Sequence, residues 1–334
     1  MYMKIKECQW CINNIHNKSI TIDKNGICNV CKDYHRNFDK ELLKDELDFI
    51  KKQKYKDGYN CMVGLSGGKD STAMLHSVLD LGFRPLAFSF QIGYNNLTQS
   101  IIKNIESFTK KLQVDYEVID IFNYINATDR ACFAGTADIY DRAMTQQISK
   151  EEFRQIYFEG RQFYSTKQNV IFPFVRPCQI CRKITIRAYY SEAVKRNIKI
   201  VFVGINEWAS NKNGRYSAIR RLQPQADLPE VFIVHLPYLL QRRYSEVIKI
   251  LESLSCDENV LETSVKTGGH SCILARACED IAFNMLGFHL DSTRLSREVT
   301  VGFIDKETAL QAITSGKYNS EKTVREVLIG CHII

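Results

Sequence analysis

Apolar and polar positions follow two different periods along the middle of the chain. Short apolar runs at residues 60–65, 85–90 and 116–120 have the length expected of buried strands. Between these runs, residues 71–81 and 98–112 carry apolar side chains at the three- and four-residue spacing of a helical face. Strands that alternate with helices in this way predict a parallel sheet with helices on both faces. We therefore expect an α/β fold with a doubly wound parallel sheet.

The same alternation resumes further along the chain. The pattern predicts a helix from Cys178 to about Arg196, strands at residues 199–204 and 231–236, and a helix from about Ser245. Parallel strands end at one edge of a sheet, and ligands of such sheets bind there. We therefore look for functional residues just after the predicted strands.

The remaining segments follow the pattern less clearly. Residues 37–58 are highly charged and form a predicted helical connector. Residues 126–175 mix polar and aromatic positions, which predicts helix and loop lining a substrate cleft. Near the C-terminus we expect one helix that runs through Met285 and another that begins after Asp305, which has the side chain of a helix cap.

Four of the twelve cysteines form two closely spaced pairs near the N-terminus, Cys8 with Cys11 and Cys28 with Cys31. Two such pairs, each of which offers two thiolates to one tetrahedral ion, are typical of zinc ribbons. Residues 19–22 alternate like a strand between the pairs. We therefore predict a zinc ribbon over residues 1–36, with bound Zn²⁺ stabilising its fold. A redox or cluster site is the alternative.

The composition of the chain indicates where the protein is located more clearly than which reaction it performs. No run of eighteen apolar residues is present, and the N-terminal segment lacks an apolar signal core. We therefore expect a cytoplasmic protein without a membrane segment, in which the cysteines bind metal or stay reduced rather than form disulfides. The net charge of +7 is compatible with ATP, pyrophosphate, an anionic carrier or nucleic acid, and requires none of them.

A glycine-rich turn joins the first predicted strand to the first predicted helix. Its sequence is Ser66-Gly67-Gly68-Lys69-Asp70-Ser71. The N–H groups and the dipole at a helix start attract an anion, and glycines let the backbone approach a phosphate closely. The lysine adds a positive charge and the two serines add hydroxyl donors. The spacing differs from that of a Walker A loop.

This hexapeptide resembles the SGGxDS signature of the PP-loop ATP pyrophosphatases. Members of that superfamily cleave ATP to AMP and pyrophosphate and adenylate an oxygen of their substrate. The resemblance implies a HUP-like sheet and a loop, Ser66 to Ser71, that binds ATP with the help of Mg²⁺. It further implies that Lys69 and Asp70 are catalytic, although Asp70 is equally compatible with a role at the start of the helix.

Residues after two other strands complete the nucleotide site that this resemblance implies. Phe88 and Phe90 end the second strand, where members of the superfamily pack a side chain against adenine. The hydrophobic core is the alternative place for both rings. Gly204 and Asn206 follow the later strand at residues 199–204 and are assigned to the same cofactor site.

The N-terminal half and a short C-terminal stretch also resemble the N-acetyl sugar amidotransferases of surface-polysaccharide biosynthesis. In that family the PP-loop domain activates an acetamido group, and ammonia arrives from a separate glutaminase subunit. The similarity rests on the cysteine pairs and on residues 22–28, 63–71, 81–86, 103–106, 295–298 and 305–310.

Three further cysteines resemble the [4Fe-4S] site of the tRNA 2-thiolation enzymes. Cys178 and Cys181 lie at a predicted helix start, and Cys272 or Cys278 is the distant third ligand. Three thiolates on four irons leave one iron open for exogenous sulfide. The helix start and the basic pair after Cys181 are expected to lower the pKa of the first two thiols. The chain lacks the Asp-Asp-type motif of those enzymes at residues 204–208, so the acceptor is not restricted to tRNA.

The two resemblances share adenylation of a carbonyl or amide oxygen and differ in the nucleophile. We prefer sulfur transfer, because amide transfer gives Cys178, Cys181 and Cys272 no task. The alternatives are an N-acetyl sugar amidotransferase, buried free thiols or a second zinc site for the three cysteines, and a non-catalytic nucleotide sensor. The expected partners are a small-molecule, carrier-bound or tRNA acceptor and either a sulfur donor or a glutaminase subunit, and a homodimer stays open.

A basic segment within residues 211–250 includes Arg215, Arg220, Arg221 and Arg242. These arginines either bind a phosphate of ATP or of an anionic substrate, or form a solvated face.

The predicted organisation has four segments. They are the zinc ribbon (1–36), the connector (37–58), the PP-loop domain (59–250) and a C-terminal helical segment that completes the substrate and cluster site (251–334).

Overall fold

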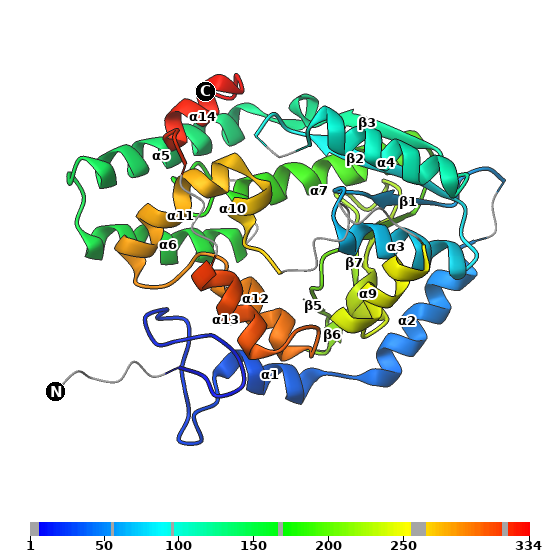
Figure 1. The fold of residues 1–334 in the computed structure, drawn as a ribbon, viewed down its shortest axis with the longest axis horizontal. Helices are drawn as coiled ribbons and strands as arrows, with labels where there is room; N and C mark the ends of the chain where they lie inside the picture. Colours follow the sequence, from blue (N-terminus) through cyan, green and yellow to red (C-terminus); the bar gives the residue numbers. More distant parts are fainter. Residues whose placement is uncertain (1–6, 55–56, 95–96, 166–169, 255–264, 316–319) are drawn as a thin grey trace.

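A six-stranded sheet forms the centre of the molecule in the computed structural model, which describes residues 7–54, 57–94, 97–165, 170–254, 265–315 and 320–334 (Figure 1). The strand order is β3-β2-β1-β4-β8-β7, and all neighbours are parallel except β7 with β8. The strands are β1 (Cys61–Gly64), β2 (Pro85–Gln91), β3 (Tyr116–Asp120), β4 (Ile200–Val203), β7 (Ile219–Leu222) and β8 (Val231–His235). A separate hairpin pairs β5 (Ala209–Ser210) with β6 (Tyr216–Ser217).

Helices cover both faces of this sheet. One face packs against α2, α3 and α4, and the opposite face packs against the second half of α7. Their bounds are α2 (Lys40–Lys52), α3 (Lys69–Asp80), α4 (Gln99–Lys111) and α7 (Cys178–Lys195). The predicted α/β fold with a doubly wound, mainly parallel sheet is confirmed. The antiparallel edge strand β7 was not predicted.

A helical layer beside the sheet is built from residues for which the sequence predicted a mixture of helix and loop. Two long helices, α5 (Ala127–Met144) and α6 (Lys150–Ser165), pack there with the first half of α7. Their inward positions include polar side chains, which hid the helical period. Thr136 and Tyr140, for example, donate hydrogen bonds to the buried carbonyls of Phe174 and Val175.

The N-terminal cysteines lie together, although the strand predicted at residues 19–22 is wrong. Within the described residues of this segment, isolated bridges join Glu7 to Asn14 and Ile22 to Cys28. The backbone pairing is limited to a short turn, in which the Asn29 N–H donates to the Thr21 carbonyl at 2.9 Å and the Asp23 N–H donates to the Ile27 carbonyl at 3.0 Å. The segment then continues directly into α1 (Asn29–Asn37). We call residues 7–37 the metal module.

The C-terminal helices connect this metal module to the sheet. Helix α12 packs with α3, α9 and α13 in one cluster, and Thr300 at its end lies 3.3 Å from the sulfur of Cys31. Lys306 donates to the Cys8 carbonyl at 2.7 Å.

The remaining elements are η1 (Ile121–Tyr124), α8 (Leu236–Leu239), α9 (Tyr244–Ser253), α10 (Gly268–Ser271), α11 (Ile273–Leu286), α12 (Ser292–Thr300), α13 (Lys306–Ser315) and α14 (Val324–Gly330). In the described part of the chain, no helix combines the length and apolarity needed to cross a bilayer.

Candidate active site

The PP loop connects β1 to α3, and its conformation depends on Gly67. Gly67 has a φ of +76°, which residues with a side chain rarely adopt. A Cβ atom at this position would also clash with Cγ2 of Ile101 on α4. At Gly68, by contrast, an added Cβ would contact only the Ser66 hydroxyl, at 3.5 Å. The fold therefore requires Gly67, whereas Gly68 keeps the loop surface accessible to a ligand.

The two serines hold the loop in shape from within. The Ser66 N–H donates to Oγ of Ser71 at 3.1 Å, and the Ser71 hydroxyl donates to the Gly68 carbonyl at 2.9 Å. Helix α3 then begins at Lys69. The N–H groups of a first helical turn have no partner within the helix, so they are available to an anion.

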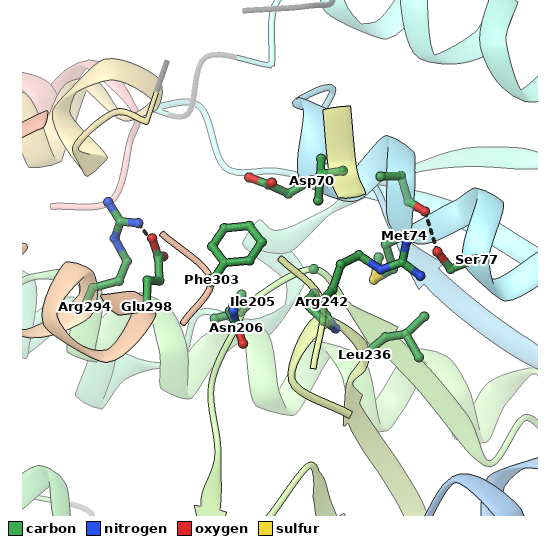
Figure 2. Close-up of a pocket in the computed structure, with 14 residues that line it drawn as sticks. Asp70, Met74, Ser77, Ile205, Asn206, Leu236, Arg242, Arg294, Glu298 and Phe303 are labelled. Carbon is green, nitrogen blue, oxygen red and sulfur yellow. Dashed lines mark hydrogen bonds and ion pairs between the residues drawn. The ribbon is translucent and has the colours of Figure 1, made fainter. Parts of the chain in front are cut away.

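A pocket of about 170 Å³ opens beside the PP loop (Figure 2). Helix α3, the turn after β4 and helix α12 form its wall, with Asp70, Asn206, Arg294 and Glu298 among the lining residues. Figure 2 shows the ring of Phe303 between the Arg294–Glu298 pair and the residues of α3. The pocket thus combines apolar surface with charged groups of both signs.

Two predicted site residues present unpaired polar atoms at this pocket. Within the described part of the chain, Oδ1 of Asp70 and both polar side-chain atoms of Asn206 are buried without a hydrogen-bond partner. Buried polar atoms nearly always have a partner in a folded protein. These three atoms therefore fit a pocket that binds a polar ligand.

Lys69 and Asp70 lie together at the start of α3. Their Nζ and Oδ2 atoms are 3.7 Å apart. Burial raises the pKa of Asp70, while the charges of Lys69 and Arg294 act in the opposite direction. A cation beside Asp70 would offset the same desolvation, so the carboxylate suits a Mg²⁺ ion bound with the nucleotide.

The other residues assigned to the nucleotide lie at the same edge of the sheet. A Cβ at Gly204 would lie 3.5 Å from Cα of Ser71, so the end of β4 packs closely on the PP loop. Phe90 is half-buried near the end of β2, and its ring centroid is 5.1 Å from that of Tyr189. Phe88 is only 1% exposed and lies in the core, the alternative place that the sequence left open. A contact of Phe90 with adenine remains a prediction.

A chain of ion pairs links this pocket to the cysteines at the start of α7. Arg294 lies 3.2 Å from Asp291, whose other oxygen lies 3.0 Å from Arg176. Arg176 precedes Cys178 by two residues; burial raises the pKa of the Cys178 thiol, and the nearby charge of Arg176 acts in the opposite direction. Although burial raises the pKa of Asp291, the charges of Arg294 and Arg176 hold it well below its usual range. The ionised carboxylate therefore fixes both guanidinium groups between the pocket and the thiol.

Cys178, Cys181 and Cys272 are grouped near the hydroxyl of Tyr94. This hydroxyl lies 2.9 Å from the sulfur of Cys181. Burial raises the pKa of Tyr94, and negative charge on any of the three nearby thiols raises it further. Cys272 precedes α11 and accepts a hydrogen bond from the Ala275 N–H at 3.4 Å. Cys178 is exposed and the other two are half-buried, so one side of the group is accessible.

Cys278, the other candidate for the third ligand, belongs to the helical core. It is fully buried within the core of the helical layer. It lies further along α11 and packs among apolar side chains. The structure therefore favours Cys272 over Cys278 as the third member of the group.

The expected lowering of the thiol pKa values at the start of α7 is wrong. Desolvation by the surrounding protein raises the pKa of both Cys178 and Cys181, even though part of the Cys178 surface is exposed to solvent. Arg182, one of the two basic residues expected to lower the pKa of these thiols, pairs with Glu207 instead. Desolvation therefore dominates, which favours ligation by a metal or protonated thiols over free thiolates.

The metal module contains a complete donor set for one ion. The sulfur atoms of its four cysteines all lie within 4.8 Å of one another and are buried; the set is Cys8, Cys11, Cys28 and Cys31. Four such thiolates fit tetrahedral Zn²⁺. Across the described residues, no other group of three or more Cys, His, Asp or Glu side chains has donor atoms this close. The three cysteines near Tyr94 are therefore spaced more widely than the ligands of a single ion.

Several charged residues at the site were not identified from the sequence. Arg176 and Asp291 are far apart in the chain, and only the packing of α7 against the C-terminal helices brings them together. Of the basic segment, Arg215 and Arg221 pair with surface carboxylates of Asp39 and Glu230. Arg242 lines the pocket. Arg215 and Arg221 therefore fit the solvated face, whereas phosphate binding by Arg242 stays a prediction.

A comparison with protein families identifies the class of the loop. The family model of the queuosine biosynthesis protein QueC, a PP-loop family, matches residues 60–172. The resemblance to the PP-loop ATP pyrophosphatases is thereby confirmed. PP-loop proteins of this superfamily are ATP-using enzymes. No curated protein matches the chain.

Solved structures of three such enzymes resemble the PP-loop chain over most of its length, each at 13% identity. NMN synthetase from Francisella tularensis covers 88% of this chain and 92% of its own, with a TM-score of 0.35. The U34-tRNA thiolase NcsA from Methanococcus maripaludis, with its [4Fe-4S] cluster, covers 97% and 96%, with a TM-score of 0.36. The NH3-dependent NAD synthetase from Campylobacter jejuni covers 85% and 100%, with a TM-score of 0.33. Likeness at this level carries no assignment of substrate.

Proposed function

We propose that the protein is an ATP-dependent sulfurtransferase that adenylates a carbonyl or amide oxygen of its acceptor. The PP loop, Ser66 to Ser71, holds the β- and γ-phosphates of ATP, and Asp70 holds Mg²⁺. The acceptor oxygen attacks the α-phosphate, and the α–β bond breaks to release pyrophosphate. Sulfur then attacks the adenylated carbon, and AMP leaves with the original oxygen.

Lys69 and the start of α3 support the first step. Negative charge grows on the leaving pyrophosphate, and fixed positive groups aimed at it lower the barrier. Lys69 is held between Asp70 and the ring of Tyr244, with its Nζ 5.6 Å from the ring centroid. Its ammonium group is therefore fixed beside the loop before ATP arrives.

The observation that carries the proposal is the ion-pair chain between the pocket and Cys178. Arg294 lines the pocket, Asp291 bridges Arg294 to Arg176, and the charge of Arg176 acts on the thiol of Cys178 two residues further along the chain. An adenylated acceptor bound at the pocket would thus lie on the same rigid network as the thiols. Amide transfer from an external ammonia source gives this connection no role.

The three cysteines fit a [4Fe-4S] cluster better than the alternatives. A second zinc site would need sulfur atoms closer together, and buried free thiols do not account for the exposed Cys178. When bound, a cluster on three thiolates has one iron without a protein ligand, which supplies a place for sulfide. The hydroxyl of Tyr94 holds Cys181 in position, and the Ala275 N–H holds Cys272.

Metal analysis of anaerobically purified protein tests this assignment with a matched pair of variants. Wild type should contain about four irons and one zinc per chain. Cys272→Ala should lose the iron and keep the zinc, whereas Cys278→Ala should keep both. Wild type without iron and acid-labile sulfide, or iron loss in Cys278→Ala alone, would contradict the proposal.

Turnover then tests the chemistry. ATP should give AMP and pyrophosphate only when an acceptor is present, and thiolated product should require sulfide or a protein sulfur donor. ATP turnover that Asp70→Asn leaves unchanged would contradict the assigned pocket, because loss of the ligand to Mg²⁺ should cost at least about 10²-fold.

An N-acetyl sugar amidotransferase is the second candidate. It is favoured by the placement of residues 295–298, part of that resemblance, on α12, where Arg297 pairs with Glu207 and Glu298 lines the pocket. This candidate requires a glutaminase partner. Product formation from ammonia, at the same rate in wild type and in iron-free Cys272→Ala, would establish it over sulfur transfer.

A further inference from the structure

A second charged cluster lies beside the pocket and has no role in the steps above. Glu207 is buried after β4 and accepts two hydrogen bonds from the Arg182 guanidinium. Nη1 of Arg297 donates to the same carboxylate at 2.7 Å. Although burial raises the pKa of Glu207, the hydrogen bond from Arg182 and the charges of both arginines lower it to about 2. Glu207 is therefore an ionised carboxylate shared by two arginines.

A third arginine, Arg220, reaches the same cluster from the edge of the sheet. Arg220 on β7 lies opposite Ile233 of β8, which is buried on the α7 face. Directly opposed residues of two strands point to the same face. Burial lowers the pKa of Arg220, and the charge of Arg182 lowers it further. Within the described residues Arg220 has no ion-pair partner of its own.

The charges in this cluster do not balance. Glu207 is paired with Arg182 and Arg297, and it attracts Arg220 without a direct contact. One carboxylate thus faces three guanidinium groups, which leaves two positive charges uncompensated. Like charges that are partly removed from water raise each other's free energy, and an anion between them relieves this. The nearby Arg176 and Arg294 differ, because each is paired with Asp291.

The cluster is placed between the two halves of the proposed reaction. Glu207 directly follows Asn206, whose amide is unpaired at the pocket. Arg182 directly follows Cys181 at the start of α7. Arg297 is adjacent to Glu298, which lines the pocket from α12. A molecule held here would lie beside both the nucleotide and the thiols.

We propose that Arg182, Arg220 and Arg297 bind a phosphate group of the acceptor, so that the acceptor is a phosphorylated molecule. This inference rests on the proposed function, because it assigns the second substrate of the adenylation. Guanidinium groups match phosphate oxygens in forked hydrogen bonds, and a phosphate dianion balances the two uncompensated charges. Glu207 orients Arg182 and Arg297 for this contact.

Titration calorimetry on the full chain, saturated with α,β-methylene-ATP and Mg²⁺, tests the proposal. The bound analogue occupies the PP loop, so added inorganic phosphate reports on the second site alone. Wild type should bind one phosphate per chain, and Arg220→Gln should bind it at least about tenfold more weakly, as for loss of a charged hydrogen bond. Arg220→Lys, which keeps the charge, should fall between the two.

The neighbouring Arg221→Gln is the matched control. Arg221 lies on the same strand, points to the opposite face and pairs with Glu230 at the surface, so its loss should leave phosphate affinity at the wild-type value. Thermal unfolding of the three variants and their affinity for α,β-methylene-ATP show whether each is folded. No phosphate uptake by wild type, or equal affinities in Arg220→Gln and Arg221→Gln, would overturn the proposal.

Two further titrants identify the source of the phosphate. Uridine 5′-monophosphate that binds more tightly than inorganic phosphate, with no binding of unfractionated tRNA, would support a small phosphorylated acceptor. Transfer RNA that displaces inorganic phosphate in an Arg220-dependent manner would support a nucleic-acid acceptor. Failure of wild type to bind α,β-methylene-ATP would count against the proposed function itself, so the two failures are distinguishable.

Discussion

The molecule contains two groups of cysteines that differ in burial and in the spacing of their sulfur atoms. The first, which we call the closed group, is fully buried with all its sulfur atoms within 4.8 Å; it comprises Cys8, Cys11, Cys28 and Cys31. The second, the open group, is spaced more widely and includes one exposed thiol; it comprises Cys178, Cys181 and Cys272. Four close thiolates complete the coordination of one ion, whereas three accessible thiols leave room for a reactant.

The surroundings of the two groups differ in the same sense. The sulfur atoms of the closed group are contacted by Asn13, the Cys28 N–H and Thr300, and together they surround one site that fits a single ion. In the open group, Tyr94 contacts Cys181 and the Ala275 N–H donates to Cys272, whereas Cys178 is exposed. This contrast indicates that the closed group serves stability and that the open group serves chemistry. Helix α12 contacts the closed group at one end and carries pocket residues along its length.

Loss of one ligand of the closed group should have the largest effect on the fold. Cys28→Ser should lose the zinc and unfold the metal module, because structural zinc contributes directly to folding. A loss of about 3 kcal/mol or more lowers the Tm by roughly 5 °C or more. Metal analysis and thermal unfolding measure both. Cys132→Ala is the control, because this buried thiol belongs to neither group, and its zinc content should match that of wild type. Equal Tm values for Cys28→Ser and wild type would remove the structural role.

Acid should affect the ion pairs of Glu207, beside the pocket, and the closed group at different pH values. The folded pKa of Glu207, about 2, is below the value of about 4.3 for an unfolded chain. Its ion pairs therefore stabilise the fold fully above about pH 4.3, and this contribution, about 3 kcal/mol, is lost as the pH falls towards 2. The closed group instead loses its ion in milder acid, because its thiolates take up protons.

Zinc release and the free energy of unfolding, both followed from pH 7 to pH 3, separate these events. The difference in unfolding free energy between wild type and Glu207→Gln should stay constant at neutral pH and shrink below about pH 4.3. Zinc should appear in solution before that difference shrinks. Simultaneous changes would mean that the two regions are not independent.

The local parts of the fold and site were predictable because adjacent residues determine them. The PP loop is one hexapeptide between an apolar run and a helical period, and β3 has the predicted bounds, Tyr116–Asp120. The cysteine pairs of the closed group are likewise recognisable from spacing alone. Helices α5 and α6 were not recognised, because residues such as Thr136 and Tyr140 bury polar groups that bond to carbonyls of a distant segment.

The parts that depend on distant contacts were not predictable. Asp291 meets Arg176 only after the C-terminal helices pack against α7, and neither residue lies in a motif. The sequence also could not distinguish Cys272 from Cys278 as the third ligand, because both follow Cys178 and Cys181 at a similar separation along the chain. Their places on α11 decide it, with Cys278 in the core and Cys272 at the helix start.

A smaller effect is expected from the hydroxyl that supports the open group. Tyr94→Phe removes the 2.9 Å contact with Cys181 and leaves the ring in the core. The net loss should be about 1 kcal/mol of stability, because the deleted hydroxyl also no longer needs desolvation. Iron content should persist, while the reduction potential of the bound iron shifts, since hydrogen bonds to the ligand sulfur tune it. An unchanged potential would mean that this contact serves packing alone.

The smallest effect on stability should come from the open group's exposed member, and it gives the sharpest test of the contrast. Cys178→Ala removes a thiol with accessible surface, so the free energy of unfolding should change by no more than about 0.5 kcal/mol. Iron and sulfur transfer should nevertheless be lost, while zinc remains. The same kind of substitution in the closed group lowers the Tm and releases zinc. If Cys178→Ala instead destabilised the protein as strongly as Cys28→Ser, both groups would be structural, and the case for sulfur chemistry at the open group would fail.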